Sequence, residues 1–359
     1  MKKSVLFFSF FLIYNSVFFA QEIIENPEKP LSKNAGRVLR LKEVMSIVDE
    51  PGKFYFRSPG EVKIAKDGSI FVSDRRGYNF LRFSPDGKFL KNLYKKGEGP
   101  GEIQDYFEYA LSQNEIYIYD LYKRKIIRMD KDGSLINEFK TYTGMYNEYI
   151  GIFRDWLVFM KKVLPEKRDK VQMYQVKNTI VLLSKDGKKE NESHVFLNKR
   201  FYVAYSGMVV WDPFNSVFDE NSGYLYVSCT REYMIHILDL NRGKVIKSFK
   251  RKYKRVPYQM KSQDEENFIR RVNAPRKKYE QDINRLHLFN GLLWVETSTK
   301  NKERGIMIDV FNNKGQFVDN FYLALDGYLM SVQNNSIFVG ERDEDGNIVI
   351  KKYIIEDEN

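Results

Sequence analysis

The chain has very few of the residues on which disulfide scaffolds and zinc sites depend. Its 359 residues include one cysteine, Cys229, and three histidines, His194, His236 and His287. A single thiol cannot form an intramolecular disulfide, so the fold has to be stabilised by core burial. The histidines show no metal-ligand spacing, whereas a zinc site needs three or four converging nitrogen or sulfur ligands. These shortages exclude a disulfide scaffold and disfavour a zinc enzyme.

Fingerprints of common catalytic and nucleotide-binding sites are also missing. The chain has no Gly-x-Ser-x-Gly, Walker or dinucleotide motif, and the glycine-rich run 97–101 precedes no expected helix. The acidic run 343–347 has part of a calcium-loop pattern, but Ile354 stands where an EF-hand loop needs a bidentate acid. We therefore predict no cofactor, with calcium as the alternative left open.

What the chain does have is apolar and positively charged residues. Hydrophobic residues make up 43% and aromatic residues 15%, which is enough for a large core. The formal net charge is +11, and such an excess favours anionic partners. We expect an anionic glycan, an envelope component or a protein partner. Nucleic acid is not expected, because none of the usual nucleic-acid signatures is present.

The first twenty residues have the outline of a secretory signal peptide. Lys2 and Lys3 precede an apolar run, and the small residue Ala20 stands before Gln21. The alternative is an uncleaved membrane anchor, because Phe18 is a poor residue three positions before the cleavage site. That anchor would be the chain's only membrane contact. We predict an exported protein, periplasmic or extracellular, in which residues 21–36 form a polar linker.

The stretch 59–102 contains a complete structural unit. Runs of strand character at 61–65, 70–73, 80–83 and 89–93 are separated by short turns rich in Asp and Gly. Asp-Gly pairs suit tight hairpins, because glycine adopts a positive φ without a Cβ clash. Four strands joined by three hairpins form an antiparallel sheet that is too small to bury its own faces.

The same unit recurs along the chain. The second strand of each unit is apolar, and it is found at 70–73, 115–120, 156–160, 224–229, 292–297 and 336–341. A four-stranded unit repeated every 40–50 residues is typical of a β-propeller. The fold class is therefore all-β, with six four-stranded antiparallel blades spanning 37–357. The sixth unit lacks an outermost strand, and Arg37–Val48 is expected to supply it and close the ring.

Particular residues carry a resemblance to a known family. Pro59-Gly60 opens a blade, SIFVSD and FLRFSPDGKFL form a strand pair, and the run 97–102 joins two blades. These features resemble the NHL-type propellers and, more closely, the exported bacterial "6-bladed beta-propeller" family, most sharply over residues 54–140. The resemblance implies an architecture rather than a chemistry, since members of such families are mostly binding modules and a minority are enzymes.

An insertion at about 253–285, between the fourth and fifth blades, is the densest basic segment. Met260, Phe268, Ile269 and Val272 could form the apolar stripe of a short helix that ends before Pro275. Two interpretations remain open. The insertion meets an anionic surface or a partner protein, or it is a solvated helix that covers the gap between two blades.

Functional residues are expected on one face of the disc. The second-to-third-strand loops and the interblade connections open on the same face and vary in length, so we call this the long-loop face. Tyr can stack and donate a hydrogen bond, and Arg can clamp a carboxylate. The alternative is that these charged groups pair with one another between blades. The candidates are Asp74, Arg75, Arg76, Tyr78, Asp120, Tyr122, Arg124, Arg231, Tyr233 and Glu296.

The sequence as a whole favours a monomeric binding or scaffold module of the cell envelope over an enzyme. Its ligand is expected on the long-loop face, over the central channel. The alternative is a channel-centred hydrolase or lyase of the lactonase type, dependent on carboxylates and calcium. Three or more acidic or amide side chains converging at the channel mouth would favour the enzyme. A third hypothesis is a protein-interaction platform built on the basic insertion.

Overall fold

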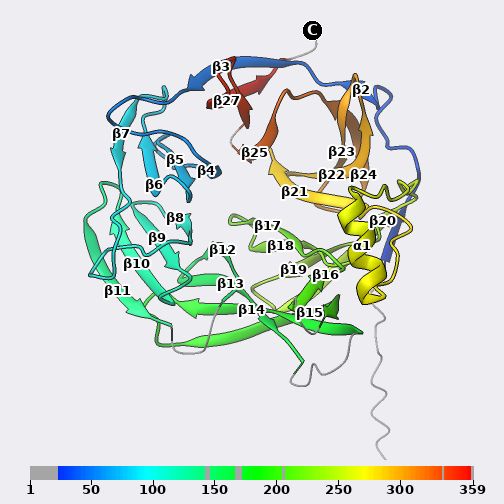
Figure 1. Ribbon diagram of the computed structural model, residues 1–359, viewed down its shortest axis with the longest axis horizontal. Helices are drawn as coiled ribbons and strands as arrows, with labels where there is room; N and C mark the ends of the chain where they lie inside the picture. The colour runs from blue at the N-terminus through cyan, green and yellow to red at the C-terminus, as the bar shows by residue number, and fades with distance from the viewer. Residues whose placement is uncertain (1–22, 142–145, 166–171, 204–206, 334, 357–359) are drawn as a thin grey trace, which may run out of the picture.

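Six sheets, antiparallel apart from one added edge strand in each of two of them, surround a central axis as the blades of a propeller (Figure 1). The computed structural model describes residues 23–141, 146–165, 172–203, 207–333 and 335–356. The signal-peptide prediction lies outside these residues. Within the described part of the chain, no helix is long and apolar enough to cross a membrane.

Blades 1 and 2 are regular four-stranded meanders, and their strands are numbered from the channel outward. Blade 1 consists of β4 Pro59–Ile64, β5 Ile70–Asp74, β6 Asn79–Phe83 and β7 Phe89–Asn92. Blade 2 consists of β8 Phe107–Leu111, β9 Glu115–Asp120, β10 Lys125–Asp130 and β11 Leu135–Lys140. The predicted hairpins of the first unit are confirmed by the antiparallel registers of β4 to β7.

Blades 3 and 4 each have a fifth strand. Blade 3 consists of β12 Glu148–Phe153, β13 Trp156–Val163, β14 Met173–Ser184, β15 Glu190–Val203 and β16 Gly207–Val210. Blade 4 consists of β17 Asn215–Asp219, β18 Tyr224–Ser228, β19 Ile235–Asp239, β20 Lys244–Arg251 and β1 Ile23–Asn26. Strands β14 and β15 have 12 and 14 residues, so blade 3 extends well beyond the regular repeat.

The insertion and the last two blades complete the ring. The helix α1 Gln263–Val272 confirms the predicted helical insertion between blades 4 and 5. Blade 5 consists of β21 Ile283–Phe289, β22 Leu292–Asn301, β23 Gly305–Phe311, β24 Phe317–Leu323 and β2 Arg37–Val38. Blade 6 consists of β25 Tyr328–Gln333, β26 Ser336–Arg342, β27 Ile348–Ile355 and β3 Leu41–Ile47. The pairing of β3 with β27 confirms the predicted closure.

The segment expected to be a linker is instead attached to the outer edges of two blades. Strand β1 pairs parallel with β20, and β2 pairs parallel with β24. Between them, the backbone amides of Leu31 and Ser32 donate hydrogen bonds to β24 carbonyls. The sequence of this polar, Pro-containing segment shows no alternation of apolar and polar residues that would indicate a strand. Its strands form only because an edge of an existing sheet offers backbone partners. The N-terminal segment 23–47 therefore runs along blades 4, 5 and 6 in turn (Figure 1).

The apolar side chains lie mainly between blades. Each of the six hydrophobic clusters draws on two neighbouring sheets, as where Phe71 and Phe80 of blade 1 pack with Phe107 and Tyr109 of blade 2. The ring centroids of Phe80 and Tyr109 are 4.6 Å apart. A blade alone would expose both faces, so burial requires neighbours on both sides.

A single asparagine connects the N-terminal segment to two blades. The Asn26 side chain is buried, and its Nδ2 donates to the carbonyl oxygens of Lys250 at 3.1 Å and Gly315 at 2.9 Å. Its Oδ1 accepts a hydrogen bond from the backbone amide of Phe317 at 2.9 Å. Asn26 thus joins β20 of blade 4 to the last hairpin of blade 5.

We predict that Asn26→Ala lowers the free energy of unfolding by about 2–3 kcal/mol, because it leaves buried backbone groups of blade 5 without partners. Urea denaturation measures the loss. The matched control, Asn34→Ala, changes an exposed asparagine of the same segment and should alter stability by less than about 0.5 kcal/mol. Equal effects of the two substitutions would contradict the prediction, because the Asn26 side-chain hydrogen bonds would then contribute no more than an exposed side chain does.

Candidate functional site

Two of the predicted site residues, Asp74 and Asp120, are buried at the ends of second strands. The Asp74 carboxylate accepts hydrogen bonds from the backbone amides of Arg57 at 2.7 Å and Ser58 at 2.9 Å. Asp120 likewise accepts one from Gln104 at 2.9 Å. In each case the carboxylate ties the end of the second strand to the connection that enters the same blade. The Asp74 and Asp120 carboxylates therefore hold the loops that lead into their own blades, and their oxygens accept hydrogen bonds from the protein backbone.

The other candidates in blades 1 and 2 make local contacts or are exposed. The Arg75 guanidinium lies 3.7 Å from the centre of the Tyr106 ring and 3.8 Å from the Glu108 carboxylate, so it pairs with the next blade. The side chains of Arg76, Tyr78, Tyr122 and Arg124 are exposed. None of these side chains lines the cleft described below.

The candidates Tyr233 and Glu296 also have partners inside the fold. The Tyr233 hydroxyl is buried and donates to Asp309 at 2.7 Å, and Arg251 forms an ion pair with the same carboxylate at 2.7 Å. Glu296 is largely buried, with one carboxylate oxygen 3.9 Å from Nε2 of His287. Neither side chain lines the cleft described next.

Arg231 lines a cleft, a cavity of about 540 Å³ on the long-loop face. It lies between blades 3 and 4 and the insertion, and we call it the cationic cleft. Six of its side chains are cationic and two are acidic. Its lining residues are Gln175, Leu197, Asn198, Lys199, Trp211, Asp212, Thr230, Arg231, Glu232, Arg255, Arg276, Lys277, Lys278 and Tyr279.

The insertion forms one wall of the cleft and is held by its own backbone. The amide of Tyr258 donates to the carbonyl of Lys278 at 3.0 Å, and the amide of Glu280 donates to that of Val256 at 2.9 Å. At the tip, Ser262 caps α1 by accepting a hydrogen bond from the amide of Glu265. Because the two arms are paired, residues 276–279 have a defined position opposite blades 3 and 4.

Arginine side chains connect this wall to blade 4. The Arg231 Nη2 donates to the carbonyl of Tyr279 at 2.5 Å. In the opposite direction, the Arg255 Nη2 donates to the carbonyl of Arg231 at 3.2 Å, and the Arg255 guanidinium lies 4.8 Å from the centre of the Tyr279 ring. Arg231, Arg255 and Tyr279 are therefore held in place by contacts within the protein.

The positive charge of the cleft is only partly compensated. Among the described residues, Lys199, Lys277 and Lys278 form no ion pair with a carboxylate. Burial and the charge of Arg231 hold the pKa of Lys277 below its usual range, and burial likewise lowers the pKa of Arg231. Crowded cations that are partly removed from water would be stabilised by a bound anion.

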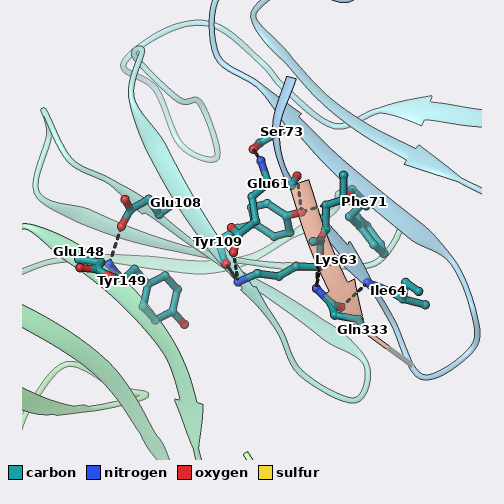
Figure 2. A network of polar contacts seen from close by, with 12 residues as sticks. Glu61, Lys63, Ile64, Phe71, Ser73, Glu108, Tyr109, Glu148, Tyr149 and Gln333 are labelled. Carbon is teal, nitrogen blue, oxygen red and sulfur yellow. Dashed lines mark hydrogen bonds and ion pairs between the residues drawn. The ribbon is translucent and has the colours of Figure 1, made fainter. Parts of the chain in front are cut away.

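A second polar group of residues lies on the innermost strands of neighbouring blades, which border the central axis, and Figure 2 shows it from close by. Glu108 accepts a hydrogen bond from the amide of Tyr149, and Ser216 donates to Glu148 at 3.3 Å. Burial and, to a smaller extent, the Glu108 charge raise the pKa of Glu148 to about 7. On another blade, Lys63 donates to the carbonyl of Tyr109 at 2.6 Å. Within the described residues, no group of three His, Cys, Asp or Glu side chains is arranged to hold a metal.

Sequence reasoning missed most of the cationic cleft. Trp211, Asn198 and Lys199 precede blade 4 in regions without a motif, whereas Lys277 and Tyr279 belong to the basic insertion. The high density of basic residues in that insertion was the available signal. It did not indicate which blades the insertion would contact, so the cleft could not be assembled from it.

Comparisons with known proteins agree with the fold. The model of a family described as 6-bladed beta-propeller matches residues 51–233. A candidate exported protein from Bacteroides fragilis has a solved structure with 14% identity and a TM-score of 0.58, aligned over 94% of this chain and 100% of that one. A member of the duf4221 family from Bacteroides vulgatus has 9% identity and a TM-score of 0.59, over 89% and 99%.

Two further results carry no functional information. Virginiamycin B lyase from Staphylococcus aureus aligns with 12% identity over 89% of this chain and 100% of that one. Its TM-score is only 0.45, so the similarity says nothing about function. A comparison with curated proteins finds no match.

We predict that Glu148→Gln changes the pH dependence of stability. The raised pKa means that the folded state favours the protonated Glu148 carboxyl. The stability that comes from this preference is fully present below about pH 4.5 and is lost as the pH rises through about 7. The free energy of unfolding of the variant, minus that of the wild type, should therefore rise by on the order of 2 kcal/mol from pH 5 to pH 8. Urea denaturation at both pH values measures it. The exposed Glu303→Gln is the control, and identical behaviour of the two variants would contradict the prediction.

Proposed function

Because the chain belongs to the 6-bladed beta-propeller family, we propose that it is a binding module of the cell envelope that holds an anionic glycan in the cationic cleft. The observation that carries this proposal is the composition of the cleft, in which six cations face two acids beside Trp211 and Tyr279. Cationic side chains attract and clamp carboxylate or sulfate groups, and aromatic rings stack on sugar rings.

The location of this site differs from the expectation based on the sequence. The long-loop face was expected to bind its ligand over the central channel. In the proposal, the ligand lies off the axis, toward the rim on which α1 lies beside blade 4 (Figure 1). The pairing within the insertion supports this location, because it holds Lys277 and Lys278 against blades 3 and 4 without help from a ligand.

Export forms part of the proposal. It rests on the charged start, apolar run and small residue within positions 1–20. The single cysteine, Cys229, is buried, so it is shielded from oxidation outside the cytoplasm. The NHL-type character of the repeat, inferred from residues 59–102, stays a prediction beside the broader family assignment.

A channel-centred hydrolase or lyase is the second candidate function. The observation in its favour is the pair formed by Glu108 and Glu148, in which one carboxyl has a pKa of about 7 and could donate a proton near neutral pH. A glycan-cleavage assay on the wild type and Glu148→Gln tests it, because a true acid catalyst would lose activity while binding in the cleft remained.

The main test uses charge reversal in the cleft. We expect the double variant Lys277→Glu/Lys278→Glu to bind polygalacturonate 10- to 100-fold more weakly than the wild type, because two attractive contacts become repulsive. Isothermal titration calorimetry at 50 mM and 200 mM salt provides the affinities, with neutral dextran as the ligand control.

The matched control is Lys300→Glu/Lys302→Glu, which reverses two exposed charges of β22 and the adjoining loop on the same face. It should change the affinity less than threefold. An equal loss in both double variants would show that diffuse surface charge, rather than the cationic cleft, is responsible for binding.

A further inference from the structure

We infer that the cationic cleft recognises a hydroxyl-bearing sugar acid, and that the Asn198 amide reads the hydroxyl groups of that unit. This inference rests on the proposed function and specifies the class of anion. Its evidence is separate from the surplus charge, because it comes from hydrogen-bonding groups that the protein leaves without partners.

Asn198 lies on β15 and is one of the residues that line the cleft. Its exposed fraction is only 2%, yet neither Nδ2 nor Oδ1 has a hydrogen-bond partner. Leaving a buried amide unpaired costs free energy, and such groups in folded proteins usually have a partner. An amide at the wall of a cleft can obtain that partner from a ligand.

The two unpaired atoms define the chemistry of the partner. The Nδ2 group needs an acceptor, and the Oδ1 atom needs a donor. A hydroxyl group supplies both, whereas a sulfate or an ionised phosphate offers acceptors and would leave Oδ1 unpaired. The cleft therefore fits an anion that also carries hydroxyl groups, such as a uronic acid.

A second unpaired amide lies on the same face of blade 3. Asn178 of β14 is fully buried, and both of its amide atoms lack partners. It pairs across the sheet with Phe196, two residues before Asn198, so the two asparagines are diagonal neighbours. Two such amides on one face are more readily explained by a shared polar occupant than by two separate packing faults.

Cations flank this pair of amides. Lys162 lies directly across from Asn178 on β13, and Arg200 follows Asn198 by two residues on the same face. Burial and the Arg200 charge lower the pKa of Lys162. A sugar acid could therefore place its carboxylate among the cations of the cleft and direct its hydroxyl groups toward Asn198.

The test uses the purified mature chain and Asn198→Leu, which keeps the side-chain volume and removes the amide. Binding of oligogalacturonate, poly-L-glutamate and sodium sulfate is measured by calorimetry at one ionic strength. The wild type should prefer oligogalacturonate to the other two by at least tenfold. In the variant this preference should disappear, while weak binding of all three anions persists.

Loss of folding does not obscure the result, because replacing an unpaired buried amide with leucine should leave the thermal midpoint unchanged or raise it. Asn191→Leu, on an exposed position of the same strand, is the matched control and should keep the preference. Equal binding of poly-L-glutamate and oligogalacturonate by the wild type would overturn the inference, as would an Asn198→Leu variant that keeps the preference.

The result also separates this inference from the proposed function. If Lys277→Glu/Lys278→Glu abolishes binding while Asn198→Leu retains the wild-type preference, the anion site stands and the assignment of Asn198 falls. A wild type that binds none of the three anions would overturn both.

Discussion

Burial between neighbouring blades is the constraint on which the rest of the structure depends. Each sheet has two apolar faces and cannot bury either without the next sheet, so the ring has to close. Closure comes from backbone hydrogen bonds between β3 and β27, which join the two ends of the chain. Because the covering strands β1 and β2 protect two further sheet edges, the N-terminal segment stabilises three consecutive blades.

The same constraint gives several polar residues at strand ends partners inside the fold. Asp74 and Asp120 satisfy backbone amides that would otherwise be buried without partners. Arg251 and Asp309 form a buried ion pair between blades 4 and 5, and the Tyr233 hydroxyl joins it. A buried pair of this kind is retained only when both charges are paired and hydrogen-bonded, so these side chains are fully committed inside the fold.

The sequence predicted the fold because its signals are local. The polar-Gly turns and short apolar strands recur along the chain, and they indicated the six blades. The missing outermost strand of the sixth unit indicated the closing strand, and the apolar stripe of the insertion indicated its helix. The cleft could not be predicted in this way, because it unites Asn198, Arg231 and Lys277 from three separate segments. Strand β1 was missed for a related reason: its pairing depends on an edge of β20 that lies more than 200 residues away.

The position of the cationic cleft follows from where the repeat is broken. A regular blade uses its apolar faces for its neighbours and its polar strand ends for its own loops, which leaves little for a ligand. Blade 3 extends past the regular length in β14 and β15, and the insertion adds a basic wall opposite that extension. The surface that these additions form is not needed for packing one blade against the next. Unpaired amides and uncompensated lysines can persist there because the rigid ring supplies the stability that they cost.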